Sequence, residues 1–521
     1  MGVSNLTLKN NIDLEEQIKK LNTIGIALSS EHNLNNLLEL IVKEARNFTN
    51  ADGGSLYIKE KGKLNFLVAQ TESLEKRNNK NKSFKSFYLP LTKESIAGYV
   101  AVTGESLNIE DVYDLPPKVE YRVAKRFDSM SGYRSKSMLV VPMRDHTNEI
   151  IGVLQLINSL NSHGQIVPFK PEYESLILSL ASQAAVAIRN VKLIEEIKNL
   201  FRSLVRYSAK AIDARSPHTA GHSGRVAKYS VRMAKAINEE TDGRLGNIYF
   251  TREEIEELRM AGWLHDIGKI GVKEHVLEKS NKLTDDQIEV IIERFENIKQ
   301  WIYSRFLQDK IKLLTNGYYH STTLEELESK MTSELADTDA FLEFIKRINK
   351  PGFMKEKDKI KLKNIAEKSY INNAGKKCNY LTQKEYINLS IKKGNLNDGE
   401  YKEIQSHVEH TLSILNKIPF TKDLKNIPKH AAAHHEYLNG TGYPNGLKGD
   451  EISIQSRIMC IADIFDALSA ADRPYKKAIP LQKSLDILNE EVKAGKLDGD
   501  IVELFIRKKL YLRPSQEADE D

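Results

Sequence analysis

Cysteine is almost absent from this chain of 521 residues, which contains only Cys378 and Cys460. Two cysteines cannot build a disulfide framework or a zinc site of thiolates, so the sequence indicates a reducing compartment. The chain also lacks an apolar N-terminal segment and a run of about 18 apolar residues. Even the stretch ILSLASQAAVAI is interrupted by Ser182 and Gln183. We therefore expect a cytoplasmic protein with no secretory signal and no membrane partner.

A large excess of charge of one sign is missing as well. The chain has 77 Lys and Arg residues against 72 Asp and Glu residues, which leaves a net charge of +5. Over this length the excess is too small to indicate a nucleic-acid polymer as partner. The hydrophobic share of 40% is enough for ordinary cores. At roughly 100–200 residues per domain, the length predicts about three or four structural units.

The first unit, residues 14–170, alternates between helical and strand-like blocks. Apolar residues in LNNLLELIVKEARNFTN recur at helical spacing. The turns KGK and DHTNE each join two strand-like segments, SLYIKE to LNFLVAQ and SMLVVPMR to IIGVLQLIN, which predicts two hairpins. Helices before and after a mainly antiparallel sheet predict an α+β domain.

This order of elements, with the words GYVAVTGESLNI and IIGVLQLIN, resembles the GAF family. The resemblance implies a sensor domain that binds a small ligand. Asn158 and Phe169 match part of the NKFDE-type nucleotide-binding motif, but the acidic pair of that motif does not follow in place. The ligand is therefore unknown at this point.

Residues 171–214 predict a long helix that links the first unit to the rest of the chain. Along it, apolar residues and one asparagine recur at alternating spacings of four and three, namely Val186, Asn190, Leu193, Ile197, Leu200, Leu204, Tyr207 and Ala211. A period of 3.5 residues is the signature of a coiled-coil seam, which predicts a homodimer. A single amphipathic helix packed on its own domain is the alternative.

Residues 215–508 are helical in pattern, and ten of the 13 histidines lie from His218 onward. A Lys-rich block at about 296–394 interrupts this unit, and we expect it to be a helical insert. Its flanks, SNKLTDDQIEVIIERF and KGNLNDGEYKEIQSHV, are similar, with Arg294 in the first at the position of His407 in the second. Similar flanks predict that the two ends of the insert lie close together. Residues 509–521 predict a solvated acidic tail.

Several histidines and aspartates in this unit have a spacing that suits metal binding. His265 and Asp266 follow the apolar segment MAGWL. An imidazole binds one ion, whereas a carboxylate can bridge two ions. Taken alone, a His-Asp pair is more often an ordinary surface pair. However, His218 and His222 are four residues apart and share a helix face.

Further candidates follow in the last third of the chain. His434 and His435 come after an apolar AAA run, and Asp463 lies among isoleucines, where burial without a cation is costly. Asp466 could replace Asp463 or serve in hydrogen bonding, and His407 and His410 compete for one ligand position. Nitrogen and oxygen donors without thiolates suit iron, manganese, zinc or nickel.

Groups suited to a phosphate ligand accompany these residues. The segment LNGTGYP, with Gly440, Tyr443 and Pro444, forms a rigid turn that lets backbone approach a ligand closely, unless it is a plain structural loop. Arg473 and Lys476 lie beyond the Asp463 segment, and their cations match phosphate.

Four motifs together, HDIGK, HHEYLNGTGYPNGLKG, ADIFDALSAADRPYKK and AGHSGRVAKYS, resemble the HD-GYP family of metal-dependent phosphohydrolases. The resemblance implies an all-α domain around two divalent ions, usually iron or manganese. Relatives with a third ion have a glutamate where this chain has His218, so a third ion is an open alternative. The family activity is hydrolysis of cyclic di-GMP to pGpG or GMP. A hydrolase of another cyclic dinucleotide or nucleotide, and a catalytically silent signalling module, are the rival hypotheses.

The resemblance also implies roles for individual residues. The metal ligands would be His222, His265, Asp266, His407, His434, His435 and Asp463, with His218 as the candidate for a third ion. Asp266 and Lys269 would be catalytic. Substrate contacts would come from Lys269, Gly440, Tyr443, Pro444, Arg473 and Lys476.

Overall fold

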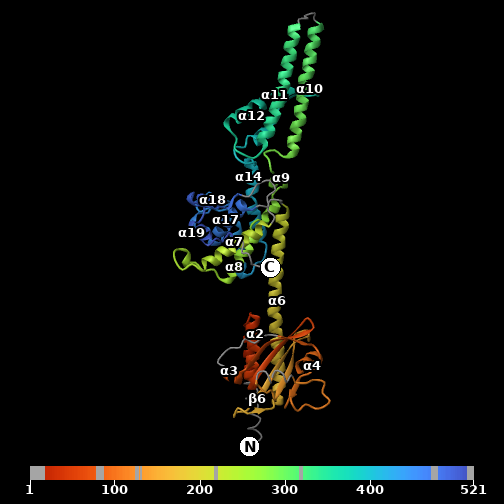
Figure 1. Ribbon diagram of the computed structural model, residues 1–521, viewed down its shortest axis with the longest axis vertical. Helices are drawn as coiled ribbons and strands as arrows, with labels where there is room; N and C mark the ends of the chain where they lie inside the picture. The colour runs from red at the N-terminus through yellow and green to blue at the C-terminus, as the bar shows by residue number, and fades with distance from the viewer. Residues whose placement is uncertain are drawn as a thin grey trace. The chain divides into compact units, whose positions relative to one another are not determined.

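The computed structural model describes residues 18–77, 87–123, 128, 132–215, 221–315, 321–470 and 479–512. The chain divides into two compact units, residues 1–201 and 202–521 (Figure 1). We describe each unit by itself.

The first unit is built around a seven-stranded sheet with the strand order β3-β2-β1-β6-β5-β4, and β7 pairs with β6. All named strand pairs are antiparallel. The strands are β1 (Ala51–Glu60), β2 (Lys63–Thr71), β3 (Phe87–Pro90), β4 (Leu107–Ile109), β5 (Met138–Arg144), β6 (Ile150–Leu160) and β7 (Ile166–Val167). The β1–β2 and β5–β6 hairpins are the two that the sequence predicts.

Helices cover both faces of this sheet. On one face, α2 (Leu34–Thr49) and the first part of α6 (Pro171–Arg215) share a core with Leu56, Leu154 and Leu156. On the other face, α4 (Ile96–Thr103) packs on the alternate residues of the strands, with α3 (Glu72–Arg77) after β2. The predicted α+β class is confirmed.

Helix α6 is a single helix of 45 residues. By length and hydropathy alone, it is the one helix among the described residues that could cross a membrane, although its apolar run is interrupted. Its residues Ile177, Leu180, Ala184 and Ile188 are fully buried against the sheet. The apolar composition of this part of α6 is therefore explained by the core of the first unit.

The later part of α6 exposes the predicted seam. The exposed fractions of Ile197, Leu200, Leu204 and Tyr207 are 64%, 61%, 58% and 67%. Val205 and Ala209, on the other face of the helix, are buried. The helix therefore packs on the protein along one side and leaves an apolar stripe uncovered on the other.

The second unit is mainly helical. Helix α7 packs on both α8 and α17, and α15 packs on α16 and on the short η2 turn. Its main elements are α7 (His222–Ile237), α8 (Arg252–Leu264), η2 (Ile267–Gly271), α9 (Glu274–Leu277), α14 (Asp398–Gln405), α15 (His407–Leu415), α16 (Ile427–Ala432), α17 (Ile454–Ser469), α18 (Leu481–Lys493) and α19 (Gly499–Arg507).

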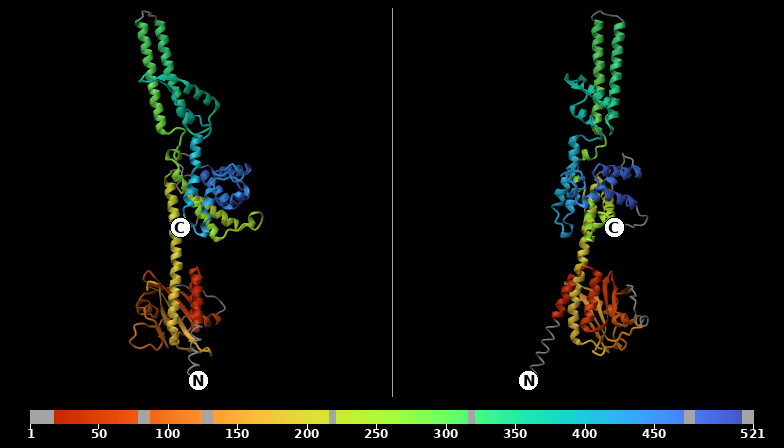
Figure 2. Two further views of the ribbon diagram at one scale, coloured as in Figure 1. Left: turned by 180° about the vertical axis from the view of Figure 1, so that it is seen from behind. Right: turned by 90° about the vertical axis from the view of Figure 1, so that its left-hand side faces the viewer.

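The insert forms a substructure with its own core. Helices α10 (Asp285–Thr315) and α11 (Ser321–Asn349) lie side by side as an antiparallel hairpin (Figure 1, Figure 2). The remaining elements are α12 (Glu356–Glu367), the β8–β9 hairpin (Ser369–Ile371 and Lys377–Asn379) and α13 (Gln383–Leu389). They pack around buried Ile298, Ile345, Leu362 and Leu389.

The two ends of the insert meet, as the similar flanks predict. The ammonium of Lys279 lies 2.8 and 2.7 Å from the carboxylate oxygens of Glu400, and Asn395 donates a side-chain hydrogen bond to the carbonyl of Lys279. The core of the insert also includes Ile291 and Phe295, which precede the expected start at about residue 296. We therefore propose 281–394 as the excisable segment.

Excision of residues 281–394 with a short linker is expected to leave a folded, metal-binding second unit, because the ends already touch. Excision of 296–394 is the matched control, and it should be less soluble because Ile291 would lose its core partners. Circular dichroism and metal analysis of both variants check this. Insolubility of the 281–394 deletion would show that the insert is part of the core of the unit.

Candidate metal centre

Three buried histidines in the second unit share one hydrogen-bonding pattern. The Nδ1 atoms of His265, His407 and His434 lie 2.9, 2.6 and 2.6 Å from the carbonyl oxygen three residues earlier. A carbonyl only accepts, so each Nδ1 carries the hydrogen and each Nε2 has a free lone pair. All three Nε2 atoms are buried and have no hydrogen-bond partner among the described residues. This is the arrangement of metal-ligating histidines, in which a carbonyl fixes the ring.

Asp266 divides its two carboxylate oxygens between different histidines. Oδ2 lies 3.2 Å from Nε2 of His265 and 3.5 Å from Nε2 of His222, whereas Oδ1 lies 3.4 Å from Nε2 of His407. Asp266 lies between these histidines because it follows His265 directly at the end of α8. Its geometry is that of a carboxylate able to bridge two ions.

Asp463, from the middle of α17, has a similar disposition. Its Oδ1 lies 3.1 Å from Nε2 of His222, and its Oδ2 lies 3.9 Å from Nδ1 of His435. The sequence assigns bridging to Asp266, and the structure adds Asp463 as a second carboxylate that faces both groups of histidines.

The ligand atoms form two groups. Those of His222, His265 and Asp266 all lie within 4.8 Å of one another, and so do those of His407, His434 and His435. The seven predicted ligands that the structure describes are therefore brought together from α7, α8, α15, α16 and α17. The donor set fits two divalent ions. His218, Arg473 and Lys476 lie outside the described residues.

Asp466 orients His222. Its Oδ2 lies 2.7 Å from Nδ1 of His222, and its carboxylate accepts hydrogen bonds of 2.6 and 3.1 Å from the Arg225 guanidinium. Asp466 is therefore the hydrogen-bonding partner of a ligand, which was one of the two roles left open. Sequence reasoning missed Arg225, whose only signal is its place three residues after His222 on the same helix.

The last turn of α6 is tied to the same ligand. The carboxylate of buried Asp213 accepts hydrogen bonds of 3.2 and 2.9 Å from the backbone and the hydroxyl of Ser223. Ser223 follows His222 in the first turn of α7. The position of His222 therefore depends on the end of α6.

The electrostatics of His407, His435 and Asp266 suit a cation. Burial lowers the pKa of His435 to about 4 and also lowers the pKa of His407. Burial alone would raise the pKa of Asp266, but Lys269 and the nearby histidines hold it well below its usual range. His407 and His435 are therefore neutral at neutral pH, and the carboxylate of Asp266 is ionised.

Lys269 lies directly beside the centre. Its Nζ is 2.6 Å from Oδ2 of Asp266. Burial disfavours the charged form, but the pKa of Lys269 is raised overall because Asp266 stabilises the ammonium. Lys269 is thus a positive group at the edge of the ligand cluster.

The Gly-rich loop covers the other side of the cluster. The ring of Tyr443 stacks on His435 with centroids 4.7 Å apart, and its backbone N–H donates a 3.2 Å bond to the carbonyl of His435. A Cβ atom on Gly442 would lie 2.5 Å from that carbonyl oxygen, so this position requires glycine. Buried Glu436 accepts hydrogen bonds of 2.7 and 3.0 Å from the backbone of Asn445 and Leu447.

Glu436 therefore holds the Gly-rich loop in place, a role that sequence reasoning missed. The available signal was the acidic residue directly after His434 and His435 in the HHE motif.

The structure also selects between His407 and His410. His410 is exposed and packs its ring against Gly271. His407→Ala is expected to lower metal content and hydrolysis strongly, whereas His410→Ala should stay within about tenfold of the wild type, roughly 1.4 kcal/mol. Metal analysis and initial rates check this, and the reverse order of effects would contradict the assignment.

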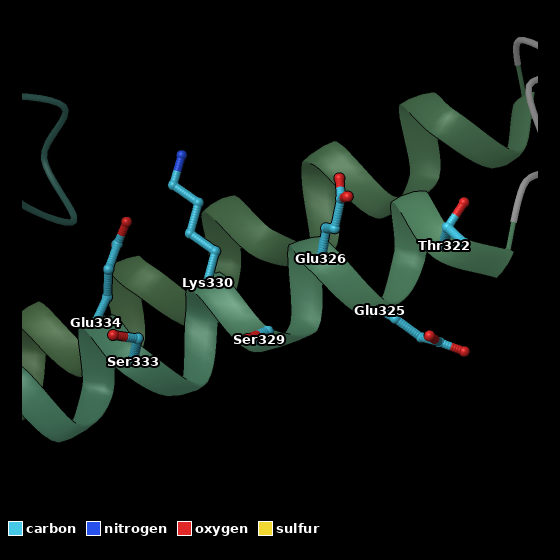
Figure 3. A pocket seen from close by; sticks show the side chains of 7 residues that line it. All are labelled: Thr322, Glu325, Glu326, Ser329, Lys330, Ser333 and Glu334. Atoms are coloured by element: carbon cyan, nitrogen blue, oxygen red, sulfur yellow. The ribbon is translucent and has the colours of Figure 1, made fainter.

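A surface hollow of about 610 Å³ lies elsewhere, on the insert. It is lined only by residues of α11, and Figure 3 shows their side chains pointing in different directions from one helix. Among the described residues, its lining includes Glu325, Glu326 and Glu334 but no histidine.

Comparison with known proteins agrees with this organisation. The GAF domain family matches residues 33–188, and HD domain families match residues 219–342 and 383–501. A GAF domain structure from an Acinetobacter phosphoenolpyruvate-protein phosphotransferase is 18% identical, with a TM-score of 0.27, and the match covers 35% of this chain and 98% of that one.

Two similar curated proteins are bacterial phosphodiesterases. The 3′3′-cGAMP-specific phosphodiesterase 3 of Vibrio cholerae is 49% identical over 126 residues, which is 24% of this chain and 26% of the relative. The cyclic di-GMP phosphodiesterase response regulator RpfG of Xanthomonas campestris is 48% identical over 83 residues, 16% of this chain and 21% of the relative. The matched segments thus span about a quarter of the length of these relatives.

The two HD matches extend into the insert from both sides and together include all seven predicted metal ligands that the structure describes. The motif-bearing segments and the ligand cluster agree with these matches. The chain therefore carries a GAF domain followed by HD-domain segments, and the motifs of these segments resemble those of the HD-GYP family.

Proposed function

We propose that the second unit is a metal-dependent phosphodiesterase that hydrolyses a cyclic dinucleotide, cyclic di-GMP, to pGpG or GMP. The observation that carries the proposal is the set of three buried, unpaired Nε2 atoms, on His265, His407 and His434, around two carboxylates. A catalytically silent module is disfavoured because all seven predicted ligands that the structure describes face this one centre.

The proposed ligands would hold two divalent ions, iron or manganese, with a third ion still an open question at His218. Bound ions of this kind polarise a phosphodiester and lower the pKa of water. Asp266 and Asp463 face both groups of histidines and so fix the separation of the two groups. The carbonyl bonds at Nδ1 keep each imidazole in the tautomer that presents Nε2.

The remaining groups would act on the substrate. Lys269 stays charged beside Asp266, so its ammonium can stabilise negative charge that develops on phosphoryl oxygens. The loop with Gly440, Tyr443 and Pro444 would contact the base or the phosphate. We assign Arg473 and Lys476 to phosphate contact on the strength of their motif alone.

Which base accompanies guanine in the cyclic dinucleotide substrate is a separate question. Three relatives from Vibrio cholerae, 49%, 39% and 48% identical over their matched segments, are named 3′3′-cGAMP-specific phosphodiesterases. This favours 3′3′-cGAMP as the second candidate substrate, which shares one guanine with cyclic di-GMP.

A panel of substrates tests the proposal. Purified protein is mixed with cyclic di-GMP, 3′3′-cGAMP, cyclic di-AMP and 3′,5′-cyclic GMP, and products are separated by chromatography. We expect hydrolysis of one or both guanine-containing dinucleotides. Exclusive hydrolysis of the mononucleotide would favour another nucleotide substrate, and binding without turnover would favour the silent module.

We further propose that two chains form a parallel homodimer through the exposed seam of α6, in the cytoplasm. The seam from Val186 to Ala211 covers 26 positions, about 39 Å of helix at 1.5 Å per residue. A small ligand of the GAF domain would control hydrolysis by shifting α6. The bonds between Asp213 and Ser223 support this route, because they join the end of α6 to the turn that carries His222.

A further inference from the structure

A second buried polar cluster lies in the HD unit, outside the ligand groups. It consists of Glu257 on α8, His430 on α16, and Ser453 and Ser456 at the start of α17. The exposed fractions of Glu257, His430 and Ser456 are 2%, 4% and 0%. None of these residues belongs to the ligand set, and no motif described above contains them.

Polar contacts connect the members of this cluster across three helices. Nδ1 of His430 lies 2.9 Å from Oγ of Ser453, within hydrogen-bond distance. Its buried Nε2 makes no hydrogen bond and faces Oε2 of Glu257 at 3.6 Å. Ser453 caps α17 through the backbone N–H of Ser456. The hydroxyl of Ser456 in turn donates a 3.3 Å bond to the carbonyl of His430.

Glu257 also holds the start of α16. Its Oε1 accepts a 2.7 Å hydrogen bond from the backbone of Asn426, and its Oε2 accepts a 3.4 Å bond from the Asn426 side chain. Burial alone would raise the pKa of Glu257, but His430 and Asn426 lower it overall. The carboxylate is therefore stable in the interior only while these partners stay in place.

Each of the three helices that meet here also delivers metal ligands. Helix α8 ends at His265 and Asp266, α16 is followed by His434 and His435, and α17 carries Asp463. Glu257 and His265 are eight positions apart, about 12 Å of helix. The cluster thus fixes the register of three helices. Its member on α8 lies about two turns from the ligands His265 and Asp266, and its member on α16 lies about one turn from His434.

We propose that the Glu257–His430–Ser453 cluster is a positioning brace that sets the separation of the metal ligands on α8, α16 and α17. A slide of any one helix would leave a buried carboxylate, imidazole or hydroxyl without its partner, which is costly. Metal ligands need placement to within about 0.5 Å. The brace is therefore a determinant of metal affinity in the metal centre on which the proposed function rests.

The test measures Mn²⁺ binding to the metal-free full-length protein, independently of hydrolysis. His430→Leu removes the hydrogen bond to Ser453 and the polar contact with Glu257, and it is expected to weaken Mn²⁺ binding at least tenfold while circular dichroism stays that of the wild type. His430→Asn keeps a polar atom near the position of Nδ1, so it should restore part of the affinity. Leu488→Ala, in the core of α18 and outside the brace, is the matched control.

A merely structural role predicts a different result. His430→Leu and Leu488→Ala would then lower the melting temperature alike and leave the Mn²⁺ dissociation constant of the folded protein unchanged, which would overturn the proposal. If His430→Leu fails to fold, Ser453→Ala replaces it, and unchanged affinity in that variant would overturn the proposal equally. If the wild-type protein binds Mn²⁺ but hydrolyses no dinucleotide, the proposed function is contradicted and the proposed brace is not.

Discussion

Asp266→Ala is expected to abolish hydrolysis and to remove most of the bound metal. Asp266 directs one oxygen to His222 and His265 and the other to His407, so its loss separates the two groups of ligands. It also removes the partner of the buried Lys269 ammonium, which would face the histidines without compensation. We expect a loss of at least about a thousandfold in rate, roughly 4 kcal/mol in the barrier.

The same prediction applies to Asp463. Because Asp463 also faces both groups, Asp463→Ala should have an effect of the same order, and neither residue should compensate for the other. Metal analysis by mass spectrometry and initial rates measure both variants, with His410→Ala as control. Retention of hydrolysis within about tenfold in Asp266→Ala, about 1.4 kcal/mol, would contradict the bridging assignment.

Charged residues in the seam of α6 are expected to prevent the proposed dimer and to yield monomers. Replacement of half-buried Leu193 and of exposed Ile197 and Leu200 by glutamate would place like charges along the apolar seam. The same variant should lose the response of hydrolysis to occupation of the GAF domain, while basal hydrolysis continues. Lys198→Glu, an exposed position off the seam, is the matched control.

Analytical ultracentrifugation of wild type and variants decides this prediction. The wild type should sediment as a dimer at micromolar concentration and the triple variant as a monomer. A monomeric wild type would exclude control through a paired α6, and the GAF domain would then be a passive neighbour of the HD domain.

Much of the fold follows from local pattern. Alternating apolar residues and tight turns predict the β1–β2 and β5–β6 hairpins, because side chains on a strand alternate between two faces. The pairing of β1 with β6, which joins the two hairpins into one sheet, links residues about a hundred positions apart. Local periodicity carries no information about such a pairing, so the sheet order could not be predicted from the residues alone.

The candidate site shows the same division. The ligands were found because metal binding needs particular residue types at particular spacings, and the family motifs supply both. Of the partners that orient them, only Asp466 was a candidate. Arg225 and Glu257 were missed, since they act through contacts between distant helices. His430 was missed for a related reason, because a single histidine on a short helix has no spacing that distinguishes it.

The metal content of the wild-type protein tests the central claim most directly. Protein purified without added chelator is analysed for metal per chain, then depleted with a chelator, assayed with cyclic di-GMP and 3′3′-cGAMP, and assayed again after addition of Mn²⁺ or Fe²⁺. We predict about two ions per chain, loss of hydrolysis on depletion and recovery on addition. Full hydrolysis by protein that retains no metal would contradict the account.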